Sequence, residues 1–137
     1  MICMDNLLGK RLEGRYLIEE LIGVGGMANV YKAFDTAEQR PVAIKMLRDE
    51  YVDNEDFLRR FRNESKAIYS LNHPNIVKIF DVILTTKNPV IVMEYVDGIT
   101  LKDYIEKKGV VGVRSAIALT MQLLLALQHA HENGIVH

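Results

Sequence analysis

Hydrophobic positions in the first two thirds of the sequence come in short runs of the kind that form β-strands. The runs cover residues 16–22, 30–34, 42–47, 76–84 and 90–96. A glycine-rich turn separates the first run from the second, and another turn separates the last two. Short links join the first three runs, so these strands are expected to form an antiparallel meander, because parallel strands need long crossover connections. The pattern therefore predicts a five-stranded antiparallel sheet over roughly residues 9–96.

One helical segment interrupts these strands. Residues three or four positions apart lie on the same face of a helix. In this segment they are Phe57, Phe61, Glu64, Ile68 and Leu71. The segment ends before Pro74, because proline cannot continue a helix. We therefore expect one helix over residues 54–71, packed against the sheet.

The chain changes from strand to helix at residues 97–99. Thr100 and Asp103 have the spacing of a capping pair for a short helix that ends near Lys107. A longer helix is expected over residues 113–132, apolar on nearly every face, as is typical of a helix buried on most sides. Too few residues remain to cover it, so we expect a large exposed apolar surface there. The predicted fold class is α+β.

Composition excludes several classes of protein. The 137 residues are 49% apolar and 26% charged, which excludes wholesale disorder. The net charge of −1 gives no electrostatic reason to bind nucleic acid. A single cysteine, Cys3, excludes an intrachain disulfide and a cysteine-based zinc site. With no secretory signal and no apolar run near the ~20 residues of a membrane span, a cytoplasmic protein is expected.

The glycine-rich turn Gly23-Val24-Gly25-Gly26-Met27-Ala28 is the first candidate for chemistry. It fits a dinucleotide-binding fingerprint, a loop that covers phosphates with Ala28 in place of one glycine, or a plain hairpin turn whose glycines supply positive φ. A dinucleotide motif must open a helix, whereas a strand is expected after this turn, which argues against that reading. The turn by itself leaves the other two readings open.

Two charged residues stand at positions that the pattern assigns to buried faces. Lys45 shares a strand face with Ala43, and Glu64 lies within the apolar stripe of the predicted helix. Separately, Lys45 reads as a solvated edge residue and Glu64 as a partner of Arg60 on the helix surface. Together, opposite charges on buried faces offset each other's desolvation, which favours a Lys45–Glu64 ion pair. Lys45 would also be able to reach phosphate oxygens.

These residues resemble the protein kinase family. Six segments of this chain resemble the motifs of that family and follow one another in the correct order. They are the glycine-rich turn, Val42-Ala43-Ile44-Lys45, Glu64, His73-Pro74-Asn75-Ile76-Val77, Met93-Glu94-Tyr95-Val96 and Gly134-Ile135-Val136-His137. The residues after the first glycines and at the hinge are similar to those of bacterial, eukaryotic-like (Hanks-type) Ser/Thr kinases, many of which carry PASTA repeats. Ala28 departs from the family's third loop glycine, and we expect it to restrict closure of the loop tip.

The resemblance implies a kinase N-lobe over residues 1–96, made of five antiparallel strands and helix C. A hinge and the start of a truncated helical C-lobe would follow over residues 97–137. The implied reaction is transfer of the ATP γ-phosphate to Ser or Thr hydroxyls. The residues implied at the ATP site are Ile22, Val30 and Ala43 around the adenine, Met93 behind it, the backbone of Glu94 and Val96 at its edge, and Gly23, Gly25, Gly26 and Lys45 at the phosphates.

Two roles remain to be weighed. Lys45, held by Glu64, is the implied catalytic lysine. By resemblance, Asp103 is a ribose-contact candidate, but its capping of the helix beside Thr100 is an equally good interpretation.

The sequence stops at the residue that resembles the His of the His-Arg-Asp motif, His137. The catalytic Asp and the magnesium ligands are expected beyond it, so we expect the chain as given to be inactive. The implied partners are ATP, Mg²⁺, proteins with Ser or Thr, and a second copy in a homodimer; any membrane span is expected after residue 137. The alternative function is a pseudokinase or a regulatory interaction module without catalysis.

Overall fold

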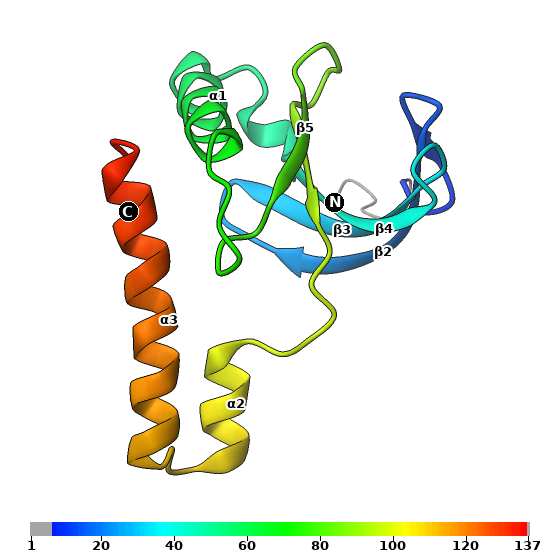
Figure 1. Ribbon diagram of the computed structural model, residues 1–137. Helices are drawn as coiled ribbons and strands as arrows, with labels where there is room; N and C mark the ends of the chain where they lie inside the picture. Colours follow the sequence, from blue (N-terminus) through cyan, green and yellow to red (C-terminus); the bar gives the residue numbers. More distant parts are fainter. Residues whose placement is uncertain (1–6, 137) are drawn as a thin grey trace. The chain divides into compact units, whose positions relative to one another are not determined.

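The computed structural model describes residues 7–136, so Cys3 and His137 lie outside the described residues (Figure 1). Its elements in chain order are β1 (Arg11–Leu12), β2 (Tyr16–Val24), β3 (Ala28–Asp35), β4 (Arg40–Leu47), the 3-10 helix η2 (Asp49–Tyr51), α1 (Glu55–Tyr69), β5 (Ile79–Ile83), β6 (Val90–Glu94), α2 (Leu101–Lys108) and α3 (Val113–Glu132). The predicted α+β class and both predicted C-terminal helices are confirmed. None of the described helices is long and apolar enough to cross a membrane.

The strands form one antiparallel sheet in the order β1-β2-β3-β4-β6-β5. The sheet has six strands rather than the predicted five. The additional strand, β1, has two residues, Arg11 and Leu12, which pair with Leu17 and Tyr16. A run of two residues is too short to give a hydrophobic period, so the sequence pattern did not reveal it.

The chain divides into two compact units, which are described separately. The sheet unit contains the described residues up to Ser70 together with Lys78–Tyr95. The helical unit contains Leu71–Val77 and the residues from Val96 onward. The segment Leu71–Val77 thus groups with α2 and α3, although it connects two elements of the sheet unit.

The sheet unit has a hydrophobic cluster on each face of its sheet. One cluster is formed by Tyr16, Ile18, Tyr31, Ala33, Val42, Ile44, Met46, Val90 and Val92. The other lies between the sheet and α1 and is formed by Ala28, Leu47, Phe61, Ile79 and Ile91. Helix α1 packs beside β5 on this second side (Figure 1). Both faces of β4 are therefore buried, as the sequence of that strand indicated.

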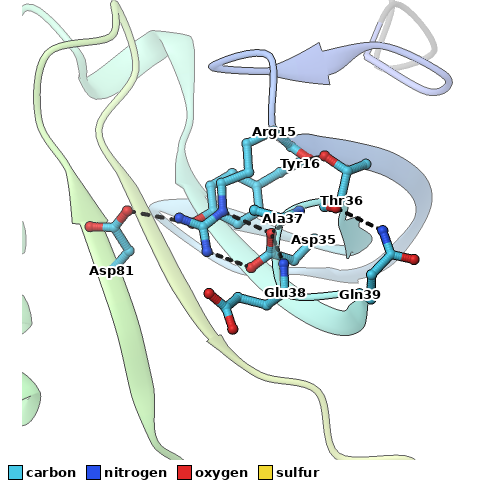
Figure 2. A network of polar contacts seen from close by, with 8 residues as sticks. All are labelled: Arg15, Tyr16, Asp35, Thr36, Ala37, Glu38, Gln39 and Asp81. Carbon is cyan, nitrogen blue, oxygen red and sulfur yellow. Dashed lines mark hydrogen bonds and ion pairs between the residues drawn. The ribbon is translucent and has the colours of Figure 1, made fainter.

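An ion pair between a partly exposed arginine and a buried carboxylate joins the start of β2 to the β3–β4 turn (Figure 2). Arg15 donates from Nε and Nη2 to the two carboxylate oxygens of Asp35, both at 2.8 Å. The backbone N–H groups of Ala37 and Glu38 donate to the same carboxylate. The Arg15 hydrogen bond, followed by these backbone bonds, lowers the pKa of Asp35 to about 2, against the opposing effect of burial. The pair thus keeps a fully buried carboxylate charged.

In the helical unit, the segment Leu71–Val77 is joined to α3 by polar contacts. The Asn75 amide donates to the carbonyl of Gln122 at 3.1 Å, and the Asn72 N–H donates to Nε2 of His129 at 3.4 Å. The His73 and His129 rings also lie against each other, with centroids 5.3 Å apart. These contacts hold the segment on α3 within this unit.

The apolar side chains of α3 are mostly exposed, as the sequence predicted. Large exposed residues on this helix are Val113, Ile117, Met121, Leu123, Leu124, Leu125 and Leu127. Ala130 is its buried residue. The helix therefore forms with most of its apolar surface uncovered.

Candidate nucleotide site

Most of the candidate site residues of the sheet unit share one face of the sheet, here called the site face. Directly opposed residues of neighbouring strands point to the same side. Gly23 pairs with Val30, Val30 pairs with Lys45, and Lys45 pairs with Ile91, which makes one cross-strand row. The lysine of this row therefore has apolar neighbours on both adjoining strands.

A second row runs beside the first on the site face. Lys32 pairs with Ala43, and Ala43 pairs with Met93. Ala43 and Lys45 are two residues apart on β4, so the predicted shared face is confirmed. Ala43 is buried, whereas Met93 and Lys45 are half-buried. The site face thus combines small and apolar side chains with an amine at partial depth, an arrangement able to take a flat ring and an anion.

The glycine-rich turn joins β2 to β3. The Gly25 N–H donates to the Ala28 carbonyl at 2.9 Å, and a Cβ on Gly25 would lie 2.9 Å from that same oxygen. Gly25 is therefore required by the close approach of two backbone segments. The described positive-φ glycines are Gly9, Gly14, Gly109 and Gly134, so positive φ is not the reason for the loop glycines.

Ala28 lies outside the loop tip, contrary to the expectation that it restricts the tip. It is the first residue of β3, and its side chain is buried in the cluster that includes Leu47 and Phe61. The alanine is therefore a core residue in this structure.

Ile22 is an exposed residue of β2, at an irregularity between Leu21 and Gly23.

The predicted Lys45–Glu64 ion pair is not formed. Within residues 7–136, no ion pair or side-chain hydrogen bond involves the Lys45 ammonium, and Glu64 is exposed on α1. The side of α1 that faces the sheet carries Leu58, Phe61 and Ile68, with Ser65 fully buried. At 100° per residue, this face is turned by roughly 60° from the predicted stripe.

Phe57 explains the error in the helix face. Its ring lies 4.7 Å from that of Tyr51, which belongs to the 3-10 helix η2. The apolar surface of Phe57 is thus covered by an element that the sequence pattern did not reveal, and Leu58 takes its place toward the sheet. Leu71 lies beyond the end of α1 at Tyr69 and belongs to the helical unit.

Three candidates stand near or beyond the end of the sheet. Glu94 ends β6; its N–H donates to the Lys78 carbonyl at 2.8 Å, and its carboxylate accepts from the Lys78 N–H at 3.3 Å. Val96 is exposed and belongs to the helical unit, as does Asp103. The site face therefore gathers Val30, Ala43, Lys45 and Met93 but does not include Val96 or Asp103.

Asp103 caps α2, as one of its two predicted roles requires. Its carboxylate accepts from the Thr100 hydroxyl at 2.6 Å and from the Thr100 N–H at 3.2 Å, and its own N–H donates to the Thr100 hydroxyl. These hydrogen bonds, that of the hydroxyl first, lower the pKa of Asp103. The capping role is confirmed, and the ribose contact stays a prediction.

Arg48 is a residue at the turn that the sequence did not single out. Its N–H donates to the Met27 carbonyl at 3.0 Å, and its guanidinium donates to the Gly25 carbonyl at 3.4 Å. It also forms an ion pair with Glu50. A lone arginine after an apolar strand gives no signal in a sequence, because such residues are normally solvated.

The described part of the chain contains no group of three or more His, Cys, Asp or Glu side chains that could hold a metal ion. A magnesium ion prefers several oxygen ligands. The site face offers an amine and apolar side chains, so these residues fit the organic part and the phosphates of a nucleotide better than they fit a metal.

Comparison with known proteins identifies the family. The family model described as "Protein kinase domain" matches residues 16–137. The serine/threonine-protein kinase PrkC of Bacillus subtilis is 50% identical over 131 residues, which is 96% of this chain and 20% of that protein. The serine/threonine-protein kinase PknB of Mycobacterium tuberculosis is 40% identical over 130 residues, covering 92% of this chain and 21% of that protein.

Solved structures agree with the sequence comparison. The crystal structure of the Mycobacterium tuberculosis PknI kinase domain superposes with a TM-score of 0.80 at 27% identity, covering 94% of this chain and 52% of that chain. The kinase-like fold that the resemblance implied is thus confirmed. The chain spans about a fifth of the length of the curated relatives and about half of the solved kinase domain. This chain belongs to the protein kinase family.

Proposed function

We propose that this chain is the ATP-binding part of a protein Ser/Thr kinase, which transfers the γ-phosphate of ATP to Ser or Thr hydroxyls of proteins. The observation that supports it is the pair of cross-strand rows on the site face. One row puts Lys45 next to Val30 and the glycine turn, and the other puts Ala43 next to Met93. An anion-binding amine beside an apolar surface suits a nucleotide.

Each residue has a role in this proposal. Val30, Ala43 and Ile22 surround the adenine ring, with Met93 behind it, and backbone groups of Glu94 and Val96 bind its edge. Gly23, Gly25 and Gly26 let the backbone approach the phosphates, whose oxygens Lys45 binds. Bound magnesium would neutralise charge on the phosphates. We place its ligands and the catalytic base beyond residue 137, and a ribose contact at Asp103.

The separation of Lys45 from Glu64 corresponds to an inactive-like arrangement. Phosphoryl transfer by kinases requires the lysine–glutamate pair to be in place. Formation of the pair would require α1 to turn so that Glu64 faces the sheet instead of solvent. We propose that this rotation accompanies assembly of the active enzyme.

The same separation favours a second candidate, a regulatory module that binds nucleotide without catalysis. An unpaired Lys45 still attracts phosphate oxygens, but it is not oriented for transfer. Protein substrates are a further proposal, supported by the likeness to the serine/threonine-protein kinases PrkC and PknB. A homodimer and a membrane anchor outside these residues stay predictions. Reading the sequence that follows His137 separates the two candidates, because an Arg-Asp and an Asp-Phe-Gly would support the enzyme.

Nucleotide binding can be tested on the chain itself by thermal shift. We expect ATP with Mg²⁺ to raise the unfolding temperature, because a ligand that binds only the folded state stabilises it. Lys45→Met should lose most of this shift, since the charge that meets the phosphates is removed. Lys66→Met is the matched control, because Lys66 is exposed on α1. Equal shifts in all three proteins, or no shift in the wild type, would contradict the proposal.

A further inference from the structure

A lysine outside the kinase motifs quoted above lies in the second row on the site face. Lys32 of β3 is directly opposite Ala43 and two residues from Val30 on the same strand. Its ammonium is 5.0 Å from the centre of the Tyr95 ring. Both residues belong to the sheet unit, and Tyr95 is the residue at which the chain leaves it.

The Tyr95 ring is the interaction partner of the Lys32 ammonium in the structure. Glu20 is directly opposite Lys32 on β2, yet it is exposed, and no ion pair within 4.0 Å joins the two among the described residues. The distance to Tyr95 is within the range of a cation–π interaction, and both side chains are half-buried. Partial desolvation strengthens such an interaction relative to a fully exposed one.

Tyr95 lies between two residues whose backbone we propose to bind the edge of the adenine. On one side, Glu94 is fixed by two hydrogen bonds with the backbone of Lys78. Strand β6 ends at Glu94, so Tyr95 is outside the β6 ladder. The contact with Lys32 connects its side chain to β3.

We propose that Lys32 is a positioning residue for nucleotide binding, which holds Tyr95 and thereby fixes the backbone of residues 94–96 where the adenine edge binds. This inference rests on the proposed nucleotide site, although the Lys32–Tyr95 contact exists without a ligand. Loss of the contact should loosen residues 94–96 and weaken binding of adenine compounds. It should not affect a ligand that has phosphates only, because Lys45 binds those.

Hydrogen exchange of the 137-residue chain tests the positioning role without any ligand. Within residues 94–96, Lys32→Leu should speed exchange of the Glu94 amide, which donates to the Lys78 carbonyl, by roughly two- to fivefold, the range for a cation–π contact of this exposure. Lys32→Arg should exchange as the wild type does, because arginine also binds a ring face. Tyr95→Leu should match Lys32→Leu, and the double variant should show no additional effect.

The control variant removes a contact of the same kind elsewhere. Arg60 lies 6.0 Å from the Phe57 ring on α1, so Arg60→Leu should leave residues 94–96 unchanged. Adenosine affinity should fall by a similar two- to fivefold in Lys32→Leu, whereas affinity for inorganic triphosphate should not change.

Unchanged exchange at 94–96 in Lys32→Leu, or equally faster exchange throughout the sheet, would overturn the positioning role. If the wild type bound neither adenosine nor triphosphate, the proposed function would fail, while the exchange data would still decide whether Lys32 positions Tyr95. If Lys32→Leu failed to fold, Tyr95→Leu and Lys32→Arg would supply the same comparison.

Discussion

The sheet unit buries many of its apolar side chains, whereas the helical unit leaves most of its own exposed. All the buried apolar residues of the described chain lie in the sheet unit, apart from Leu71 and Ala130. In α3, by contrast, Leu124 is 58% exposed and its apolar neighbours are similarly uncovered. The sheet unit therefore has a core of its own, and the helical unit does not have one of comparable size.

This difference has a consequence for the site. Val30, Ala43, Lys45 and Met93 are placed by strands whose opposite face or flanks are packed, so their positions depend on the core of the sheet unit. Val96 and Asp103 belong to a unit held by local hydrogen bonds and by few buried contacts. The candidate residues of the sheet unit are therefore held in place by a core, whereas those of the helical unit depend on local hydrogen bonds.

Truncation of an aliphatic side chain should have the largest effect, and only in the sheet unit. Ile44 is fully buried, and Ile44→Ala should lower the free energy of unfolding by about 2–5 kcal/mol through lost burial and a cavity. Leu124→Ala is the matched change in the helical unit and should cost less than about 0.5 kcal/mol, because Leu124 is exposed. Urea unfolding measures both variants, with hydrogen exchange of the β4 amides reporting on the sheet unit and exchange of the α3 amides reporting on the helical unit.

Comparable losses for the two variants would break the comparison. They would mean that the exposed face of α3 is covered in solution, by a second copy or by another surface. Light scattering of the wild type at the same concentration would then distinguish self-association from a monomer.

Acid should destabilise the sheet unit through Asp35. Its pKa is about 2 when folded and near the ordinary 3.8 when unfolded, so its contribution is complete at pH values well above 3.8 and is lost as the pH falls toward 2. The shift corresponds to roughly 1–2 kcal/mol after allowance for the partly exposed Arg15. Asp35→Asn should lower stability at neutral pH by a similar amount and flatten this acid dependence.

Asp56 supplies the control for this acid effect. Its ion pair with Arg59 has the same 2.8 Å distance, but both side chains are 70% exposed. Asp56→Asn should therefore change the unfolding free energy by less than about 0.5 kcal/mol. An acid profile that is unchanged in Asp35→Asn would contradict the role of burial in separating the two pairs.

The sequence predicted the regular elements better than it predicted their contacts. The bounds of α3, the capping pair of α2 and the shared face of Ala43 and Lys45 all follow from local periodicity and capping chemistry, and all are confirmed. Strand β1 and the 3-10 helix η2 are too short to produce a period. Short elements were therefore the part of the fold that pattern analysis could not reveal.

The site shows the same division. Alternation along β3 and β4 indicates which residues share a face, and pairing in register brings Val30 next to Lys45. The predicted orientation of α1 about its own axis was wrong, because this orientation depends on the contact of Phe57 with Tyr51. Contacts such as Lys32 with Tyr95 join distant parts of the chain and leave no local signal.

The smallest effect should come from a helix cap, and it should be confined to the helical unit. Thr100 and Asp103 form the capping box of α2, a helix of eight residues that would be marginal without tertiary contacts. Thr100→Ala should cost about 1 kcal/mol of α2 stability, seen as faster exchange of the 101–108 amides. Thr120→Ala is the control: the Thr120 hydroxyl donates to the Ala116 carbonyl inside α3, where alanine is the better helix former, so no loss is expected.

The capping box should also depend on pH. Because the box lowers the pKa of Asp103, the contribution of the box to α2 stability should persist at neutral pH and disappear as the pH falls through that lowered pKa. If Thr100→Ala exchanged at the wild-type rate, α2 would owe its stability to packing, and the contrast between the two units would be smaller than the exposed fractions imply.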